Sequence, residues 1–260
     1  MFHREDGTHA PLAKDPPMPW TDARLAELPD DRGFRLRGLE MTRLEGFVDA
    51  AFAFATTMLV ISLSGIPSSV GELTAALKDV PAFLAGFVSI ASFWQGHRRW
   101  SRRYGLEDGP TIQLSLALVF VMLVFVYPLK MVFSALFAWV SNGWLPTSFS
   151  LRTGQELAQL FVVYGVGFCA MTGIVALLYG RALKAREALR LNDLEQLMTR
   201  QAVTAHVIMA GTGLASALCA WLLPVRWGMW SGFFYATLPV TMPLTAILYE
   251  RRAERLRAAS

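Results

Sequence analysis

The amino-acid sequence predicts an all-α, polytopic membrane protein with six transmembrane helices and both termini in the cytoplasm. Hydrophobic residues make up 54% of the 260 residues and charged residues only 17%, whereas soluble globular domains carry about 25% charged residues. The apolar residues are concentrated in runs long enough for membrane helices, which need about 20 residues each. Lysine and arginine gather beside alternate ends of these runs, as cytoplasmic loops require.

The first 38 residues are expected to form a flexible cytoplasmic extension. This stretch is polar, mixes acids and bases, and lacks an apolar h-region before Met41, which argues against a cleaved signal peptide. It also contains five prolines: Pro11, Pro16, Pro17, Pro19 and Pro29. A six-helix membrane domain is therefore predicted over residues 39–250, followed by a basic cytoplasmic tail at 251–260.

Turn residues and charges set the boundaries of the six predicted spans. A stretch rich in glycine, proline and serine after Ser64 ends the first span, and residues 72–79 form a short interfacial helix before the second. Pro128 is expected to kink the third span. A charged stretch over 181–200 separates the fourth and fifth spans. The predicted spans are 39–64, 81–100, 111–140, 155–180, 202–223 and 229–249.

The basic residues determine the predicted orientation. Before Met41 there are six of them, and the loop after the second span, the 181–200 stretch and the C-terminal tail carry most of the others. The intervening loops hold only Lys78, Arg152 and Arg226. Since cytoplasmic loops are enriched in lysine and arginine, both termini are placed in the cytoplasm.

The first span carries a bulky apolar stripe beside a stripe of small residues. Phe54, Met58 and Ile61 are spaced i, i+4 and i+7 and therefore share one face. Ala50 and Ala53 lie on a neighbouring face, where small side chains let helices approach closely. Most stripes of this kind face lipid or the protein core, and lining a pore is the less common role.

Four polar side chains lie at the same cytoplasmic boundary, where the first span begins and the second ends. These are Arg43, Asp49, Trp94 and His97. Asp49 can accept hydrogen bonds from a guanidinium, an indole or an imidazole, so we expect one buried network between the two helices. The alternative is ordinary anchoring of tryptophan and histidine at the membrane interface.

These residues carry a resemblance to a known family. Arg43-x-x-x-Phe47-Val48-Asp49 resembles the Arg-x-x-x-Phe-Ser-Asp signature of the transmembrane protein 175 family, which comprises endosomal and lysosomal potassium channels and prokaryotic relatives. The segment from Phe93 to Arg98 is similar to the family's Tyr/Phe-Trp-x-x-His segment. The resemblance covers most of the chain and implies a homotetrameric, potassium-selective channel in a prokaryotic plasma membrane, with no enzymatic activity and no cofactor.

The resemblance also implies roles for individual residues. The first helix of each subunit would line the pore, and rings of Phe54, Met58 and Ile61 would narrow it. Arg43, Asp49, Trp94 and His97 would brace the cytoplasmic end of that helix. Three departures from the family pattern bear on selectivity and gating. Val48 replaces the signature serine, Thr56 stands where prokaryotic relatives often have an aliphatic residue, and Phe54 replaces a branched aliphatic. Four Phe54 rings would either close the pore more firmly or offer their faces to a cation.

Two other classes of function remain open at this stage. His97 and His206 lie at similar depths on different helices and could be axial ligands of a haem in an electron carrier. A secondary transporter is the other alternative, although no internal repeat supports it. Common enzyme motifs are absent. Val163-Tyr164-Gly165-Val166-Gly167 faintly resembles a potassium filter sequence but is interpreted as helix packing. The expected partners are further copies of the chain, potassium ions and membrane lipid, and not nucleic acid.

Overall fold

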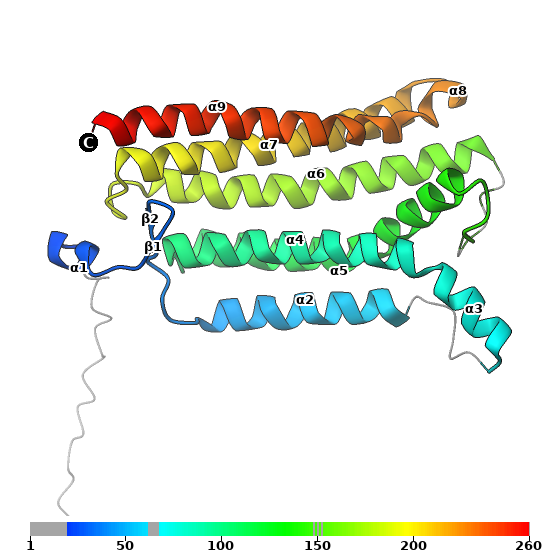
Figure 1. Ribbon diagram of the computed structural model, residues 1–260, viewed down its shortest axis with the longest axis horizontal. Helices are drawn as coiled ribbons and strands as arrows, with labels where there is room; N and C mark the ends of the chain where they lie inside the picture. The colour runs from blue at the N-terminus through cyan, green and yellow to red at the C-terminus, as the bar shows by residue number, and fades with distance from the viewer. Residues whose placement is uncertain (1–19, 62–67, 148, 150, 152, 260) are drawn as a thin grey trace, which may run out of the picture.

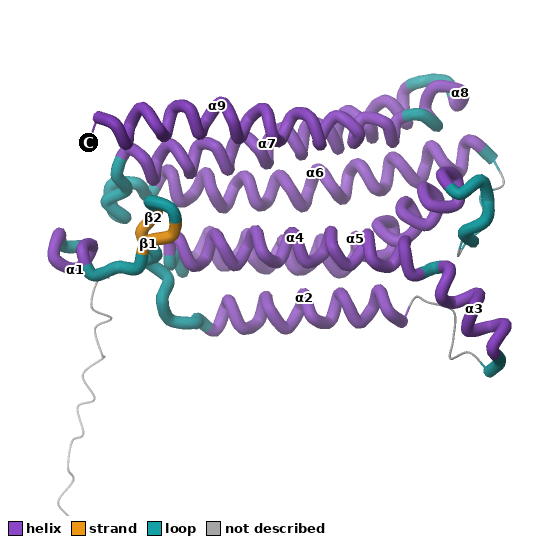
Figure 2. Tube along the Cα trace, in the orientation of Figure 1, coloured by secondary structure: helices purple, strands orange, loops and turns teal. Residues whose placement is uncertain are grey.

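Long helices lie side by side along one direction, as Figure 1 shows. The computed structural model describes residues 20–61, 68–147, 149, 151 and 153–259. The described residues form two short strands, β1 (Asp30–Asp31) and β2 (Phe34–Arg35), and are otherwise helical or in loops (Figure 2). The helices are α1 (Asp22–Ala26), α2 (Arg43–Ile61), α3 (Val70–Lys78), α4 (Val80–Tyr104), α5 (Gly109–Val140), α6 (Gly154–Lys184), α7 (Asp193–Leu222), α8 (Val225–Gly228), the 3₁₀-helix η1 (Ser231–Thr237) and α9 (Leu238–Ala259).

The described helices contain five stretches that are long and apolar enough to cross a membrane. These are α2, α5, α6, α7 and the stretch from Val225 to Ala258. Helices α3 and α4 meet the same criterion only together, and they are bent by 45° at the break between them. The predicted count of six spans therefore applies if this bent pair crosses as one span.

Side-chain caps explain where several helices begin. Asp108, Thr153 and Asn192 each accept a hydrogen bond from a backbone N–H in the first turn of the following helix, which satisfies a donor that has no partner within the helix. Asn192 and Glu195 cap each other reciprocally, so α7 starts at Asp193 and not near residue 202 as the apolar pattern predicts. At the C-terminus, the predicted basic tail is helical and continues α9 to Ala259.

Glycines allow α6 and α7 to pack closely. A Cβ atom built on Gly165 would lie 2.6 Å from the Gly213 carbonyl oxygen, and one on Gly213 would lie 2.9 Å from the Gly165 carbonyl oxygen. Both distances are shorter than a carbon–oxygen contact allows. The close approach of α6 and α7 therefore requires glycine, which has no side chain, at both positions. The stretch from Val163 to Gly167 lies within α6, where Gly165 serves this helix packing.

Both described ends of the chain lie at the same end of the helix bundle (Figure 1). At this end α4, α6 and α9 finish and α2, α5 and α7 begin. The arginines of residues 98–103 and the basic residues that close α6 and α9 are all found there. We call it the basic end of the bundle.

Candidate functional site

Among the described residues, helix α2 has one face packed against the rest of the chain and an opposite apolar face that is largely exposed. The packed face repeats every three or four residues and contacts α4 and α5. Its buried members are Glu45, Val48, Phe52, Ala55 and Leu59. On the opposite side, Phe54 is 55% exposed, Ile61 is 67% exposed and Phe47 is 54% exposed, while Met58 is half-buried. An exposed apolar face on a membrane helix can contact lipid, another subunit or a pore.

The structure brings together two of the four polar residues expected to form a network. The Trp94 indole N–H donates a 2.7 Å hydrogen bond to Asp49 Oδ1 and so joins α4 to α2. The guanidinium of Arg98 lies 5.6 Å from the centre of the Trp94 ring. Asp49 and Trp94 therefore form a direct bridge between the candidate pore helix and its neighbour.

The other two members lie elsewhere. His97 is buried and its Nε2 lies 3.1 Å from Ser115 Oγ on α5, so its ring faces a third helix. Arg43 is exposed, and in the described part of the chain no hydrogen bond or ion pair joins it to Asp49. The single network predicted from the sequence is thus divided, and its histidine joins α4 to α5.

Aromatic rings form a continuous chain of contacts between the two histidines. His97 contacts Trp100, Trp100 contacts Tyr104, Tyr104 contacts Tyr179, and Tyr179 stacks on His206, with centroid distances of 5.5–6.1 Å. Three aromatic rings thus separate the imidazoles along this path. His206 Nδ1 also lies 2.7 Å from the Ala202 carbonyl oxygen. This arrangement does not favour a haem held between the two histidines.

The N-terminal segment, residues 20–39, packs onto the basic end of the bundle. The sequence predicts a flexible extension up to residue 38, whereas the structure packs Leu25, Phe34 and Arg37 of this stretch in buried positions. Phe34 is fully buried and meets Tyr104 edge-on at 5.4 Å. The hairpin turns at Arg32 and Gly33, which both have positive φ, as the tight hairpin turn between two strands requires. Residues 1–19 lie outside the described residues.

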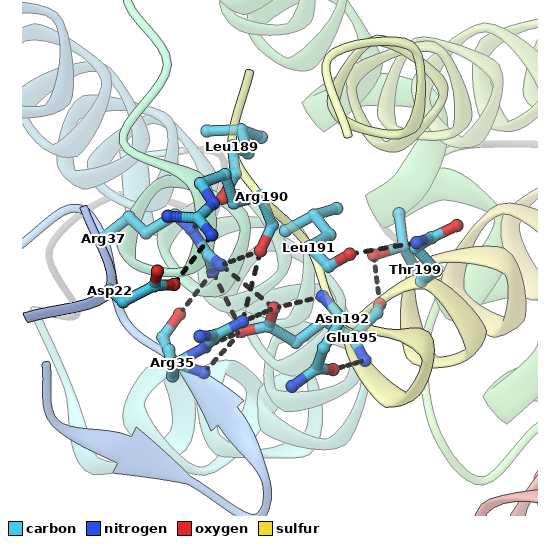
Figure 3. Close-up of polar contacts among 10 residues, drawn as sticks. Asp22, Arg35, Arg37, Leu189, Arg190, Leu191, Asn192, Glu195 and Thr199 are labelled. Carbon is cyan, nitrogen blue, oxygen red and sulfur yellow. Dashed lines mark hydrogen bonds and ion pairs between the residues drawn. The ribbon is translucent and has the colours of Figure 1, made fainter. Parts of the chain in front are cut away.

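A buried carboxylate on α7 holds this segment in place. Glu195 receives two hydrogen bonds from the Arg35 side chain, at 3.1 and 2.8 Å, and two from Arg37, at 3.0 and 2.9 Å. Figure 3 shows both guanidinium groups directed at the same carboxylate. Arg37 Nε also donates to the Leu189 carbonyl oxygen at 2.9 Å. Bidentate arginine–carboxylate pairs are geometrically specific, so this contact fixes the register of the segment.

Backbone contacts then tie the same segment to the end of α4. The Gly38 N–H donates to the Arg102 carbonyl oxygen at 3.0 Å, and Arg102 Nη1 donates to the Leu39 carbonyl oxygen at 2.9 Å. A Cβ atom on Gly38 would lie 2.3 Å from the Ser101 carbonyl oxygen, so glycine is required for this approach. Because α2 begins four residues after Leu39, the segment connects α4 and α7 directly to the candidate pore helix.

The opposite end of the bundle contains a buried ion pair. Lys130 Nζ lies 3.2 Å from Asp79 Oδ2, and the two side chains are only 6% and 10% exposed. Asp79 lies at the bend between α3 and α4. The pair therefore joins that bend to α5, because a buried charge needs a partner.

The chain is similar in sequence to known potassium channels. Residues 43–128 match the family described as endosomal/lysosomal potassium channel TMEM175. A potassium channel of Marivirga tractuosa is 33% identical over 235 residues, which is 86% of this chain and 93% of that protein.

Two solved structures are also similar. The crystal structure of a single-residue variant of the potassium channel MtTMEM175, in complex with a nanobody–MBP fusion protein, superposes with a TM-score of 0.74 at 32% identity. The match covers 85% of this chain and 98% of that one. A lysosomal potassium-selective channel TMEM175 homologue from Chamaesiphon minutus gives a TM-score of 0.52 at 18% identity, over 80% and 96% of the two chains, and this match bears on the fold alone.

Proposed function

The chain belongs to the TMEM175 potassium-channel family, and from this premise we propose that it is a potassium-selective channel whose pore is lined by α2. It is a multi-pass membrane protein. The observation that carries the proposal is the division of α2 into a packed face and an apolar face that is largely exposed among the described residues. A closed ring of such faces would line a path along the symmetry axis of an oligomer.

Four copies around one axis is the proposed assembly. The apolar face of α2 would then enter the centre, with successive rings of Phe54, Met58 and Ile61 along the path. Apolar constrictions gate channels by expelling water until the pore widens. The basic end of the bundle would face the cytoplasm of a prokaryotic cell, in line with the distribution of lysine and arginine. Phe54 then lies closest to the cytoplasm, because α2 begins at the basic end.

Potassium flux in proteoliposomes tests the proposed activity. The purified chain should release potassium down its gradient faster than sodium, and the flux should need neither a counter-ion nor a proton gradient. A flux that requires a second ion would indicate a secondary transporter instead. If there is no flux, and none appears when Phe54 and Met58 are replaced by serine, the proposal of an α2-lined channel is wrong.

An absorption spectrum of the same preparation tests the haem alternative. A bound haem would give a strong visible band, and the channel proposal expects none. Cross-linking in the membrane, followed by size analysis, tests the assembly, for which four linked subunits is the expected upper limit.

A further inference from the structure

A cavity of about 330 Å³ lies at the basic end, where the N-terminal segment crosses the last turns of α4. Four arginines of α4 line it, together with Trp94 on the same helix and Asp31 on the segment. The arginines are Arg98, Arg99, Arg102 and Arg103. Their spacing of one, four and five residues places them along one side of the helix.

The charge of this cavity is strongly unbalanced. Asp31 is the acid in its lining, and its carboxylate lies 3.6 Å from Arg103 Nη2. Two acids of α2 lie nearby: Asp49 accepts the Trp94 hydrogen bond, and Glu45 acts electrostatically on Arg98 and Arg102. Four guanidinium groups therefore meet one carboxylate in the lining, and cavities lined by one sign of charge concentrate the field.

Arg103 supplies a second, independent observation. Its side chain is only 11% exposed, and its guanidinium lies 4.8 Å from the centre of the Phe34 ring. Its Nε atom is buried and has no hydrogen-bond partner among the described residues. A buried donor without a partner is costly, and Arg103 is among the residues that line the cavity.

We propose that this cavity binds a phosphate-bearing anion, the chemistry shared by an acidic phospholipid headgroup and a soluble phosphate ester. Arginine is suited to this ligand because its planar, forked donors match phosphate oxygens. The volume lies at the low end of the roughly 300–1,000 Å³ of small-ligand sites, enough for a headgroup. Clusters of four or more lysines and arginines at the cytoplasmic end of a membrane helix are typical of sites that bind anionic lipid headgroups.

The position of the site links its occupant to two parts of the molecule. Asp31 belongs to the β-hairpin of the N-terminal segment, and Trp94 is hydrogen-bonded to Asp49 on α2. A bound phosphate would bridge Arg98 and Arg99, which are exposed, to Arg103, which packs against the hairpin. Binding should therefore stabilise the docked form of the segment as well as neutralise the arginines.

A binding assay on the full-length chain in detergent tests the proposal without requiring conduction. The probes are dioctanoyl phosphatidylglycerol, dioctanoyl phosphatidylcholine and glycerol 3-phosphate, and the readout is the rise in thermal midpoint with probe concentration. The test variant is Arg98→Gln with Arg99→Gln, and the matched control is Arg251→Gln with Arg255→Gln. The control removes the same charge from exposed positions of α9 at the same end.

Phosphatidylglycerol should bind saturably to the parent, and the apparent affinity should fall at least tenfold, on the order of 1 kcal/mol per arginine, in the test variant but not in the control. Glycerol 3-phosphate binding as well as the lipid would identify a soluble ester, and binding of the lipid alone would identify a headgroup site. Equal binding of phosphatidylcholine, equal losses in both variants, or no binding of either phosphate probe would overturn the proposal. If the double variant is already unstable without probe, the single variant Arg99→Gln replaces it. Arg99→Gln should bind phosphatidylglycerol more weakly than the parent does, and its binding should depend less steeply on salt concentration.

Discussion

Arg37 and Glu195 form an ion pair in which both side chains are fully buried, with 2.9 Å between Nη2 and Oε2. The two residues are 158 positions apart in the chain. This pair joins the segment that leads into α2 to the first turn of α7. It shows that residues 20–39 pack against the helix bundle, and that the Glu195 carboxylate joins the backbone contacts to α4 and the buried Phe34 ring in holding them there.

Replacing that carboxylate should destabilise the protein strongly. Glu195→Gln leaves Arg35 and Arg37 facing a neutral amide, and breaking a buried ion pair in this way costs about 3–5 kcal/mol. Thermal unfolding in detergent should show a clear drop in midpoint, and limited proteolysis should cut the N-terminal segment faster than in the parent. Glu187→Gln is the matched control, because the Glu187 side chain is 86% exposed and pairs with its neighbour Arg186. Equal stability of the two variants would contradict the role assigned to Glu195.

The same contact marks the limit of what the sequence could predict. Arg35 and Arg37 occur in a polar, proline-containing stretch, and local composition gives no sign of a partner on α7. The Asp49–Trp94 bridge was predictable, because both residues fall at the same membrane boundary on consecutive helices. His97 was assigned to that bridge because it is three residues from Trp94, but it faces α5 instead. Apolar runs located the long helices, whereas caps such as Asn192 shifted their ends.

The hydrogen bond from Trp94 to Asp49 should contribute measurably to the attachment of α2. Trp94→Phe keeps an aromatic ring but removes the donor, and hydrogen bonds to charged groups contribute about 1.5–3 kcal/mol. We expect a lower thermal midpoint, and Asp49→Asn should be milder because the amide oxygen can still accept. Trp221→Phe provides the control, since Trp221 is 73% exposed. A Trp94→Phe variant as stable as Trp221→Phe would argue against the bridge.

Close packing of α6 on α7 predicts a sharp difference between two glycines of one helix. Gly165→Ala places a Cβ against the Gly213 carbonyl oxygen, whereas the space around Gly173 is open within 4 Å. Overpacking of this kind costs about 1–3 kcal/mol, so Gly165→Ala should lower the thermal midpoint. Gly173→Ala should leave it unchanged or raise it, because alanine favours helix. The idea fails if both substitutions have the same effect.

The contact between Asp108 and Arg181 predicts a specific acid sensitivity. Partial burial opposes ionisation of Asp108, but hydrogen bonds from Thr111 and Arg181 outweigh it and hold the pKa of Asp108 below its ordinary value. The unfolded-state pKa is about 3.9, so ionised Asp108 contributes stability at neutral pH that is lost as the pH falls through the folded-state pKa.

Asp108→Asn isolates this contribution, because asparagine still caps a helix but carries no charge. Its midpoint should lie below that of the parent at pH 7, and the two should converge below about pH 4. Asp193→Asn, at an exposed position in the first turn of α7, serves as the control. A gap between parent and Asp108→Asn that stays constant down to acid pH would rule out the ion pair as its source.

The exposed apolar face of α2 makes the most direct prediction for conduction. Replacing Phe54 by serine exchanges a ring of four aromatic side chains for small polar ones in the proposed pore, which lowers the cost of wetting the constriction. Potassium flux in proteoliposomes should rise several-fold. Phe120→Ser is the control, since Phe120 on α5 is 68% exposed, compared with 55% for Phe54, but lies on a different helix. Increased flux in Phe54→Ser alone would support a constriction on α2, whereas equal changes in both variants would mean that the substitutions act through general destabilisation and that Phe54 does not gate the pore.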